Sequence, residues 1–113
     1  MSAVKQVFAE IDEVLKEDTS YVDDVNAIYQ FNINDEEPGV YQLILKGADS
    51  YTIEGEEETS DCTLQLAGDD FVKLANGELN GTQAFMSGKL KIKGNMGLAL
   101  KLQSILASFN KQK

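Results

Sequence analysis

The stretch GKLKIKGNMGLALKLQ, from Gly88 to Gln103, decides the fold of this 113-residue chain. Its first part alternates lysine with a large apolar residue, Leu90 and then Ile92, which predicts a β-strand with one apolar and one cationic face. Gly94-Asn95 then breaks the alternation, and the apolar residues that follow recur at helical spacing. A strand that leads into a closing helix indicates a sheet with helices packed against it.

The closing helix, predicted over roughly residues 96–110, has more apolar surface than one packing face requires. The narrow polar stripe of its helical wheel consists of Gly97, Lys101, Ser104, Ser108 and Lys111. We therefore expect apolar contacts on two sides of the helix, the second being another subunit, a deeper core or a ligand cavity. Gln103 falls among the apolar positions, so its amide needs a partner from the backbone, water or a ligand head group.

The remainder of the chain predicts a single domain, residues 1–113, of α+β class. Helical spacing of apolar residues predicts an amphipathic helix over residues 3–17, and a helical turn around Ser20–Val25 follows it. Alternation then predicts strands around residues 29–33, 41–45, 51–53 and 62–66, the first two joined by a turn at Asp35–Gly39. Consecutive strands joined by such short connections are expected to be antiparallel.

Two short helices are predicted between the fourth strand and the lysine-rich strand. The first is capped by Asp69 or Asp70 and ends at Asn76-Gly77. The second contains Ala84, Phe85 and Met86. We expect helices to pack on one face of the sheet.

The net charge of −9 is divided unevenly along the chain. Residues 1–80 contain all 19 acidic residues and four lysines, a charge of −15, whereas residues 81–113 contain six lysines and no acid, a charge of +6. The overall acidity argues against nucleic-acid binding, which needs an extended basic surface. The basic end could meet a phosphate or an anionic membrane, or could serve solubility alone.

The chain lacks the residues on which common kinds of catalysis and metal binding depend. The chain has no histidine, which removes the commonest general base and transition-metal ligand, so we predict no catalytic residue, metal or cofactor. The single cysteine, Cys62, alternates with core-type leucines and is expected to be a buried thiol. The acidic run at residues 54–61 lacks the ligand spacing of an EF-hand, so a solvated loop is favoured over weak calcium binding.

From Asp61-Cys62-Thr63 through Asp70-Phe71 and Asn76-Gly77 to GKLKIKGNMGLALKLQ, the chain resembles the sterol carrier protein type two family. The resemblance is strongest over residues 61–106, and the order of elements extends it to the whole chain. It implies a five-stranded, mostly antiparallel sheet covered by helices and enclosing an apolar tunnel. It also implies binding and transfer of fatty acids, fatty acyl-CoA, sterols or similar lipids without transforming them.

The tunnel-lining segments of the family correspond here to Phe71, Leu74, Phe85, Met86, Leu90, Ile92, Met96, Leu100, Gln103 and Leu106. In some members the matching glutamine is the polar group of the tunnel. The resemblance further implies transient membrane or acyl-CoA contact through the Lys89, Lys91 and Lys93 face, and a lipid-metabolising enzyme as a possible partner. The ending Lys111-Gln112-Lys113 departs from the peroxisomal tripeptide of many members, so we expect a cytoplasmic protein.

Two alternatives remain open at this point. The surplus apolar face of the closing helix could be the interface of a dimer or of a protein-interaction module. The chain could also be an accessory subunit that presents an apolar substrate to a separate enzyme.

Overall fold

The computed structural model describes residues 3–17, 25–34, 39–56 and 59–112, and in this part of the chain it confirms the α+β class. In chain order the elements are α1 (Ala3–Glu17), β1 (Asn26–Ile33), β2 (Gly39–Lys46), the 3₁₀ turn η2 (Gly47–Asp49), β3 (Tyr51–Glu54), β4 (Cys62–Leu66), α2 (Gly68–Ala75), α3 (Gly81–Met86), β5 (Lys91–Gly94) and α4 (Met96–Gln112). The turns expected at Ser20–Val25 and Asp35–Gly39 fall almost entirely outside the described residues.

The five strands form one mixed sheet in the order β3-β2-β1-β4-β5. The pairs β1–β2, β2–β3 and β4–β5 are antiparallel, whereas β1 and β4 run parallel, with Tyr29 opposite Cys62 and Phe31 opposite Leu64. The prediction of a mostly antiparallel sheet is confirmed. The expectation that consecutive strands pair is wrong for β3 and β4, because the chain passes β2 and β1 before it adds β4 beyond β1.

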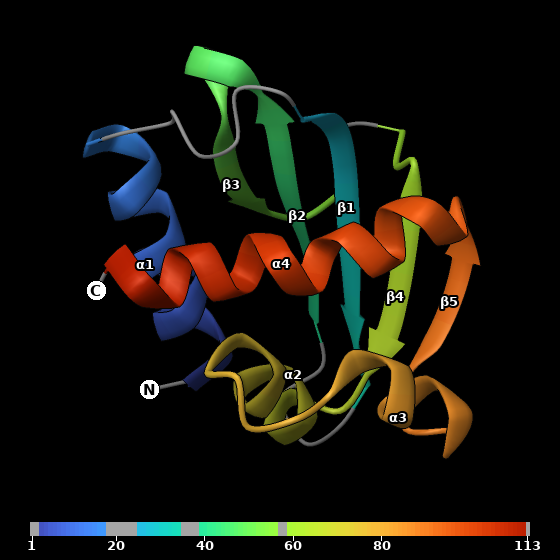
Figure 1. Cartoon of the computed structure of the whole chain (residues 1–113). Helices are drawn as coiled ribbons and strands as arrows, with labels where there is room; N and C mark the ends of the chain where they lie inside the picture. The colour runs from blue at the N-terminus through green and yellow to red at the C-terminus, as the bar shows by residue number, and fades with distance from the viewer. Residues whose placement is uncertain (1–2, 18–24, 35–38, 57–58, 113) are drawn as a thin grey trace.

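Helices cover one face of the sheet, as expected. Helix α4 crosses the strands, α1 lies on the side of β3, and α2 and α3 lie toward one end of the sheet (Figure 1). The boundaries of α1 agree with the predicted range of 3–17, and α4 continues to Gln112, two residues beyond the rough estimate. None of the helices in the described residues is long and apolar enough to cross a membrane.

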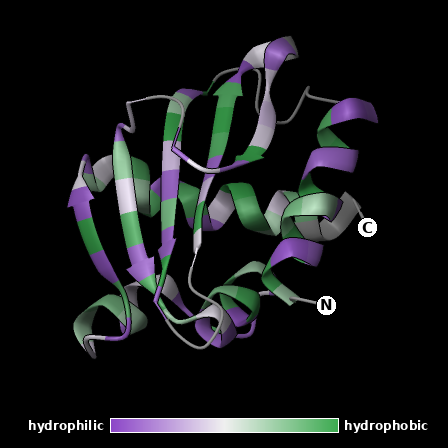
Figure 2. Cartoon of the chain, turned by 180° about the vertical axis from the view of Figure 1, so that it is seen from behind, coloured by the Kyte–Doolittle hydropathy of each residue, from purple (hydrophilic) through white to green (hydrophobic). Residues whose placement is uncertain are grey.

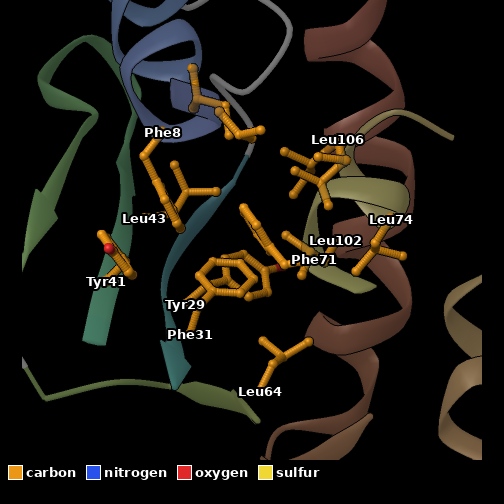
Figure 3. Packing of buried hydrophobic residues seen from close by; sticks show 14 of the residues in the cluster. Phe8, Tyr29, Phe31, Tyr41, Leu43, Leu64, Phe71, Leu74, Leu102 and Leu106 are labelled. Carbon is orange, nitrogen blue, oxygen red and sulfur yellow. The ribbon is translucent and has the colours of Figure 1, made fainter. Parts of the chain in front are cut away.

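The core between sheet and helices is organised by aromatic rings. Phe8 of α1 stacks on Tyr41 at a ring-centroid distance of 4.7 Å and on Phe71 of α2 at 4.9 Å. Phe31 meets Phe71 edge to face at 5.1 Å. Figure 3 shows these rings between the strands and the inward-facing leucines of α4. Such aromatic pairs add to the free energy gained from buried area and fix α1 and α2 against the sheet.

Helix α2 begins differently from the prediction. Its N-cap residue is Ala67, and both Asp69 and Asp70 lie in the first turn, where negative charge interacts favourably with the helix dipole. The end of the helix is as expected, with Asn76 as the C-cap and Gly77 at a φ of 80°. This left-handed residue turns the chain toward α3, which lies at the edge of the site described next.

Candidate functional site

Helix α4 has apolar contacts on two sides, as its sequence predicts. Leu102, Ile105, Leu106 and Phe109 are buried against the core, whereas Met96 and Leu100 remain 45% and 67% exposed. The exposed pair faces a groove between α4, α3 and β5. The second apolar side of the helix therefore forms the wall of a cavity.

The groove is apolar and draws on five elements or their flanking residues. It is lined by Leu64, Leu74, Gly81, Thr82, Phe85, Leu90, Ile92, Met96, Ala99, Leu100, Leu102 and Gln103. The buried side chains of Leu64, Leu74 and Leu102 form its floor and also belong to the core (Figure 3). Its cavity volume is about 60 Å³, space for only a few water-sized groups. This volume is too small to enclose a long lipid chain.

Polar side chains enter the groove at one place. The Oε1 atom of Gln103 accepts a hydrogen bond from the backbone N–H of Gly81 at 3.1 Å, which connects α4 to the start of α3. Thr82 is the other polar side chain of the lining, and its backbone N–H donates to the N-cap residue Asn80 at 2.9 Å. The amide of Gln103 is thus held by nearby backbone, one of the partners that the sequence left open.

Seven of the ten side chains expected around a tunnel line the groove: Leu74, Phe85, Leu90, Ile92, Met96, Leu100 and Gln103. Three others lie elsewhere. Phe71 and Leu106 are fully buried in the core, and Met86 is 80% exposed next to the groove. Phe71 lies outside the groove because the rings of Phe8 in α1 and Phe31 in β1 pack against it. Helical periodicity does not reveal such contacts between elements.

Sequence reasoning missed five lining residues, Leu64, Gly81, Thr82, Ala99 and Leu102. Leu64 could have been found, because it faces Ile92 across β4 and β5. The described residues form a groove at this site and do not show the enclosed tunnel that the resemblance implied. Gln103 is correspondingly exposed, where the resemblance implied a buried polar group inside a tunnel.

The lysines of β5 lie on one face of the sheet, as the alternation in the sequence predicts. Lys91 and Lys93 alternate with Ile92, so they point to the sheet face opposite the groove, beside Gln65 and Thr63 of β4. Figure 2 shows this side of the sheet, with hydrophilic and hydrophobic residues alternating along β5. Lys89 precedes the strand and is exposed next to α3.

Two buried groups behind the groove have shifted pKa values. Burial raises the pKa of the Tyr29 phenol above its usual value, and nearby Cys62 and Asp61 raise it further. The hydroxyl of Tyr29 donates to the backbone oxygen of Leu98 at 2.7 Å, so it attaches β1 to the first turn of α4. Burial, reinforced by Asp61, also raises the pKa of the Cys62 thiol, and a neutral thiol is a poor nucleophile.

Among the described residues, no group of three or more His, Cys, Asp or Glu side chains could hold a metal ion. The lining of the groove contains no ionisable side chain. The site can therefore desolvate an apolar chain and offer an amide and a hydroxyl to its polar end.

Two curated relatives with similar sequences are much longer than this chain. Bovine hydroxysteroid dehydrogenase-like protein 2 is 40% identical over 109 residues, which covers 96% of this chain and 26% of that protein. Human sterol carrier protein 2 is 36% identical over 103 residues, covering 88% of this chain and 19% of that protein. The chain thus spans about a quarter or less of the length of these relatives.

Solved structures share the fold along almost the full chain. The sterol carrier protein domain 2 of Helicoverpa armigera superposes with a TM-score of 0.76 at 29% identity and covers 94% of this chain and 87% of its own. Sterol carrier protein 2 of Aedes aegypti, determined in complex with palmitate, gives 0.74 at 22% identity and covers 93% and 94%. Residues 8–107 match the SCP-2 sterol transfer family, and the chain belongs to that family.

Proposed function

We propose that this chain binds a single-chain or sterol-like lipid in the groove between α3, α4 and β5 and transfers it without chemical change. The observation that supports this most directly is the exposure of large apolar side chains. Within the described residues these are Phe85, Met86, Met96 and Leu100, of which three line the groove. Apolar surface kept in contact with water at one groove is typical of a binding site for an apolar ligand.

Desolvation supplies the affinity in this proposal. Each buried methylene group contributes about 0.8 kcal/mol, so a long acyl chain can be held without a charged anchor. Selectivity among chains is expected to be loose, because one methylene more or less changes affinity little. Gln103 and Thr82 would orient the polar end of the ligand. The palmitate complex of the Aedes aegypti relative supports a fatty acid as one ligand class, and fatty acyl-CoA and sterol-like lipids are further candidates.

A role as an accessory to an enzyme is a second candidate. The bovine relative contains this domain as about a quarter of a chain named for a dehydrogenase. This observation favours a lipid that is presented to a lipid-metabolising enzyme, whether on the same chain or separate. Our proposal also includes transient membrane contact through the lysine-bearing end of the chain, which includes Lys89, Lys91 and Lys93.

The first experiment is native mass spectrometry of gently purified protein, followed by extraction and identification of any released lipid. We expect a monomer with a bound lipid of discrete mass, and saturable uptake of a fluorescent fatty acid by the delipidated protein. Incubation with an acyl-CoA should return it unchanged, in agreement with a carrier. A ligand-free monomer that takes up no fluorescent lipid would refute the proposal, and a ligand-free dimer would favour the interaction module.

A further inference from the structure

The two edge strands of the sheet differ in what covers their outer sides. Strand β3 is bordered by α1, whose Asp12 carboxylate accepts the backbone N–H of Thr52 at 3.2 Å. The Thr52 hydroxyl also donates to the Phe8 oxygen of the same helix at 3.4 Å. Strand β5 ends the sheet on the opposite side and forms the border of the molecule in both views (Figure 1, Figure 2). Among the described residues, one edge of the sheet is therefore closed by a helix and the other is open.

The register of β5 decides which of its backbone groups face outward. Asn95, which follows the strand, donates its N–H to the Asp61 oxygen at 3.1 Å, so these two residues form a hydrogen-bonded pair. Such pairs alternate with non-bonded ones in an antiparallel ladder, so Ile92 and Gly94 direct their N–H and C=O groups away from β4. The described residues supply no hydrogen-bond partner for these groups at that edge. A further strand can pair with them.

The side chains of β5 give this open edge a different chemistry on each face. Lys91 and Lys93 are exposed on the face opposite the groove, where their neighbours on β4 are the uncharged Gln65 and Thr63. No ion pair within the described residues includes either lysine. Ile92 points to the other face and lines the groove. The edge therefore offers two positive charges on one face and an apolar side chain on the other.

We propose that the open edge of β5 binds an extended segment of a partner protein in which acidic and apolar residues alternate. In antiparallel pairing, an apolar residue opposite Ile92 exchanges both backbone hydrogen bonds with it and places its side chain on the groove face. The acidic residues on either side then lie opposite Lys93 and Lys91, on the face that carries those lysines. Backbone pairing supplies the affinity, and the lysines select an acid–apolar–acid sequence.

A second copy of this chain is a poorer occupant of the edge. If β5 paired antiparallel with β5 of another copy around Ile92, Lys91 of each copy would face Lys93 of the other. Like charges directly opposite each other destabilise a strand pair. A bilayer attracts the lysines but has no ordered row of donors and acceptors for the backbone of Ile92 and Gly94. An acidic strand complements both the charges and the backbone groups.

The test uses the full chain and a fluorescent peptide of alternating glutamate and valine, with binding measured by anisotropy. We expect saturable binding with a Kd below about 1 mM that weakens at high salt, because exposed charges are then screened. A peptide of the same composition, with glutamates and valines in separate blocks, should bind at least about tenfold more weakly. N-methyl groups on the valines, which remove the pairing donors, should weaken binding as much, whereas N-methyl groups on the outward-facing glutamate nitrogens should not.

Exchange of charge tests the lysines. Lys91→Glu/Lys93→Glu should weaken binding of the glutamate–valine peptide about tenfold or more, and should bind a lysine–valine peptide in its place. The control Lys46→Glu/Lys73→Glu changes the net charge equally at exposed positions of other elements and should weaken binding much less. All four lysines are exposed, so both variants should fold.

Hydrogen exchange measured by NMR locates the bound peptide. At saturation the amides of Ile92 and Gly94 should exchange about tenfold more slowly, and the Thr52 amide at the far edge should be unchanged. Equal binding of the alternating and block peptides, equal effects of the two lysine pairs, or unprotected Ile92 and Gly94 amides would overturn the proposal. Protection of these amides in a peptide-free dimer, or by anionic vesicles and not by the peptide, would assign the edge to a second copy or a bilayer and overturn it too.

This inference goes beyond the proposed function, because strand pairing uses the backbone of β5 and not the cavity. Peptide binding without uptake of a fluorescent fatty acid would refute the lipid carrier alone. Fatty-acid uptake without peptide binding would refute the docking edge alone.

Discussion

Gln103 accepts a hydrogen bond from the backbone N–H of Gly81 at 3.1 Å, and this bond joins α4 to α3 across one end of the groove. Gly81 is the first residue of α3, a helix of six residues with Ala84 as its buried side chain. A Cβ atom at position 81 would lie 3.1 Å from the same Oε1 atom, so the two helices already approach closely there. We expect this contact to restrain the part of the site that must widen for a ligand.

Removing the side-chain amide should loosen α3 without unfolding the domain. In Gln103→Leu, the free energy of unfolding should fall by no more than about 1.5 kcal/mol, the usual contribution of one hydrogen bond. Hydrogen exchange at the Gly81 amide should accelerate about tenfold, and the exchange of core strands should stay unchanged. The matched control is Ser104→Ala at the next, exposed position of α4. Equal acceleration in both variants, or none in Gln103→Leu, would contradict a restraint by this bond.

Filling the groove should weaken ligand binding at little cost in stability. Leu100 is 67% exposed on the groove wall, so Leu100→Trp can place its ring in the cavity without disturbing the core. We expect fluorescent fatty-acid affinity to fall at least about tenfold, because a cavity this small cannot hold both groups. Ala107→Trp introduces the same ring at an exposed position of α4 outside the groove and should bind normally. Unchanged binding in Leu100→Trp would place the ligand elsewhere.

Stability should decrease in alkali because of Tyr29 and Cys62. Both folded-state pKa values are raised, so the folded protein keeps its protons where the unfolded chain releases them. The corresponding free energy is fully present below the unfolded-state pKa values, about 8.5 for cysteine and about 10 for tyrosine. It is lost as the pH rises above them. Urea midpoints from pH 7 to pH 11 should therefore be level at first and then decline.

Tyr29→Phe identifies the contribution of the phenol to this decline. At pH 7 the variant should be less stable by about 1 kcal/mol, because it lacks the hydrogen bond to the Leu98 oxygen. Its alkaline decline should be shallower, so the two stability curves approach each other at high pH. Parallel curves over the whole range would show that Tyr29 does not titrate with unfolding.

Alanine substitutions at two glycines should distinguish the cost of backbone strain from the cost of a steric clash. A Cβ atom at Gly94, where φ is 103°, would lie 2.5 Å from the backbone oxygen of Asp61. Gly88 has a φ of 85°, and a Cβ atom there would have no neighbour within 4 Å. Gly88→Ala should therefore cost about 1 kcal/mol from backbone strain alone. Gly94→Ala should cost about 3 kcal/mol or more, since strand β4 must also shift. Thermal denaturation of the two variants checks the order, and equal losses would contradict it.

Local patterns in the sequence predict most elements correctly. Helix α1 was expected over residues 3–17 and occupies that range, because its apolar residues repeat at helical spacing between polar ones. The alternation of Leu90 and Ile92 with lysines predicts β5 in the same way. Cys62 is buried as expected, since it shares a strand face with Leu64 and Leu66. These properties depend on the order of side chains within one element.

The lining of the groove was only partly predictable. Leu100 and Ile92 are on apolar faces that the sequence reveals, and they line the groove. Phe71 has an equally apolar pattern but is buried by Phe8, Phe31 and the remaining core. A local pattern identifies which face of an element is apolar, and it contains no information on which partner covers that face.

The sequence by itself therefore determined the class of fold, the apolar surplus of α4 and the concentration of lysines after residue 80. Tertiary structure alone decided that β4 joins β1 in parallel, that Gln103 bonds to Gly81, and that the groove is open. The physical reason is the separation in sequence of the residues that determine each property. Periodicity and charge are set by neighbours along the chain, whereas strand order and cavity shape depend on contacts between residues far apart in sequence, which only the folded packing brings together.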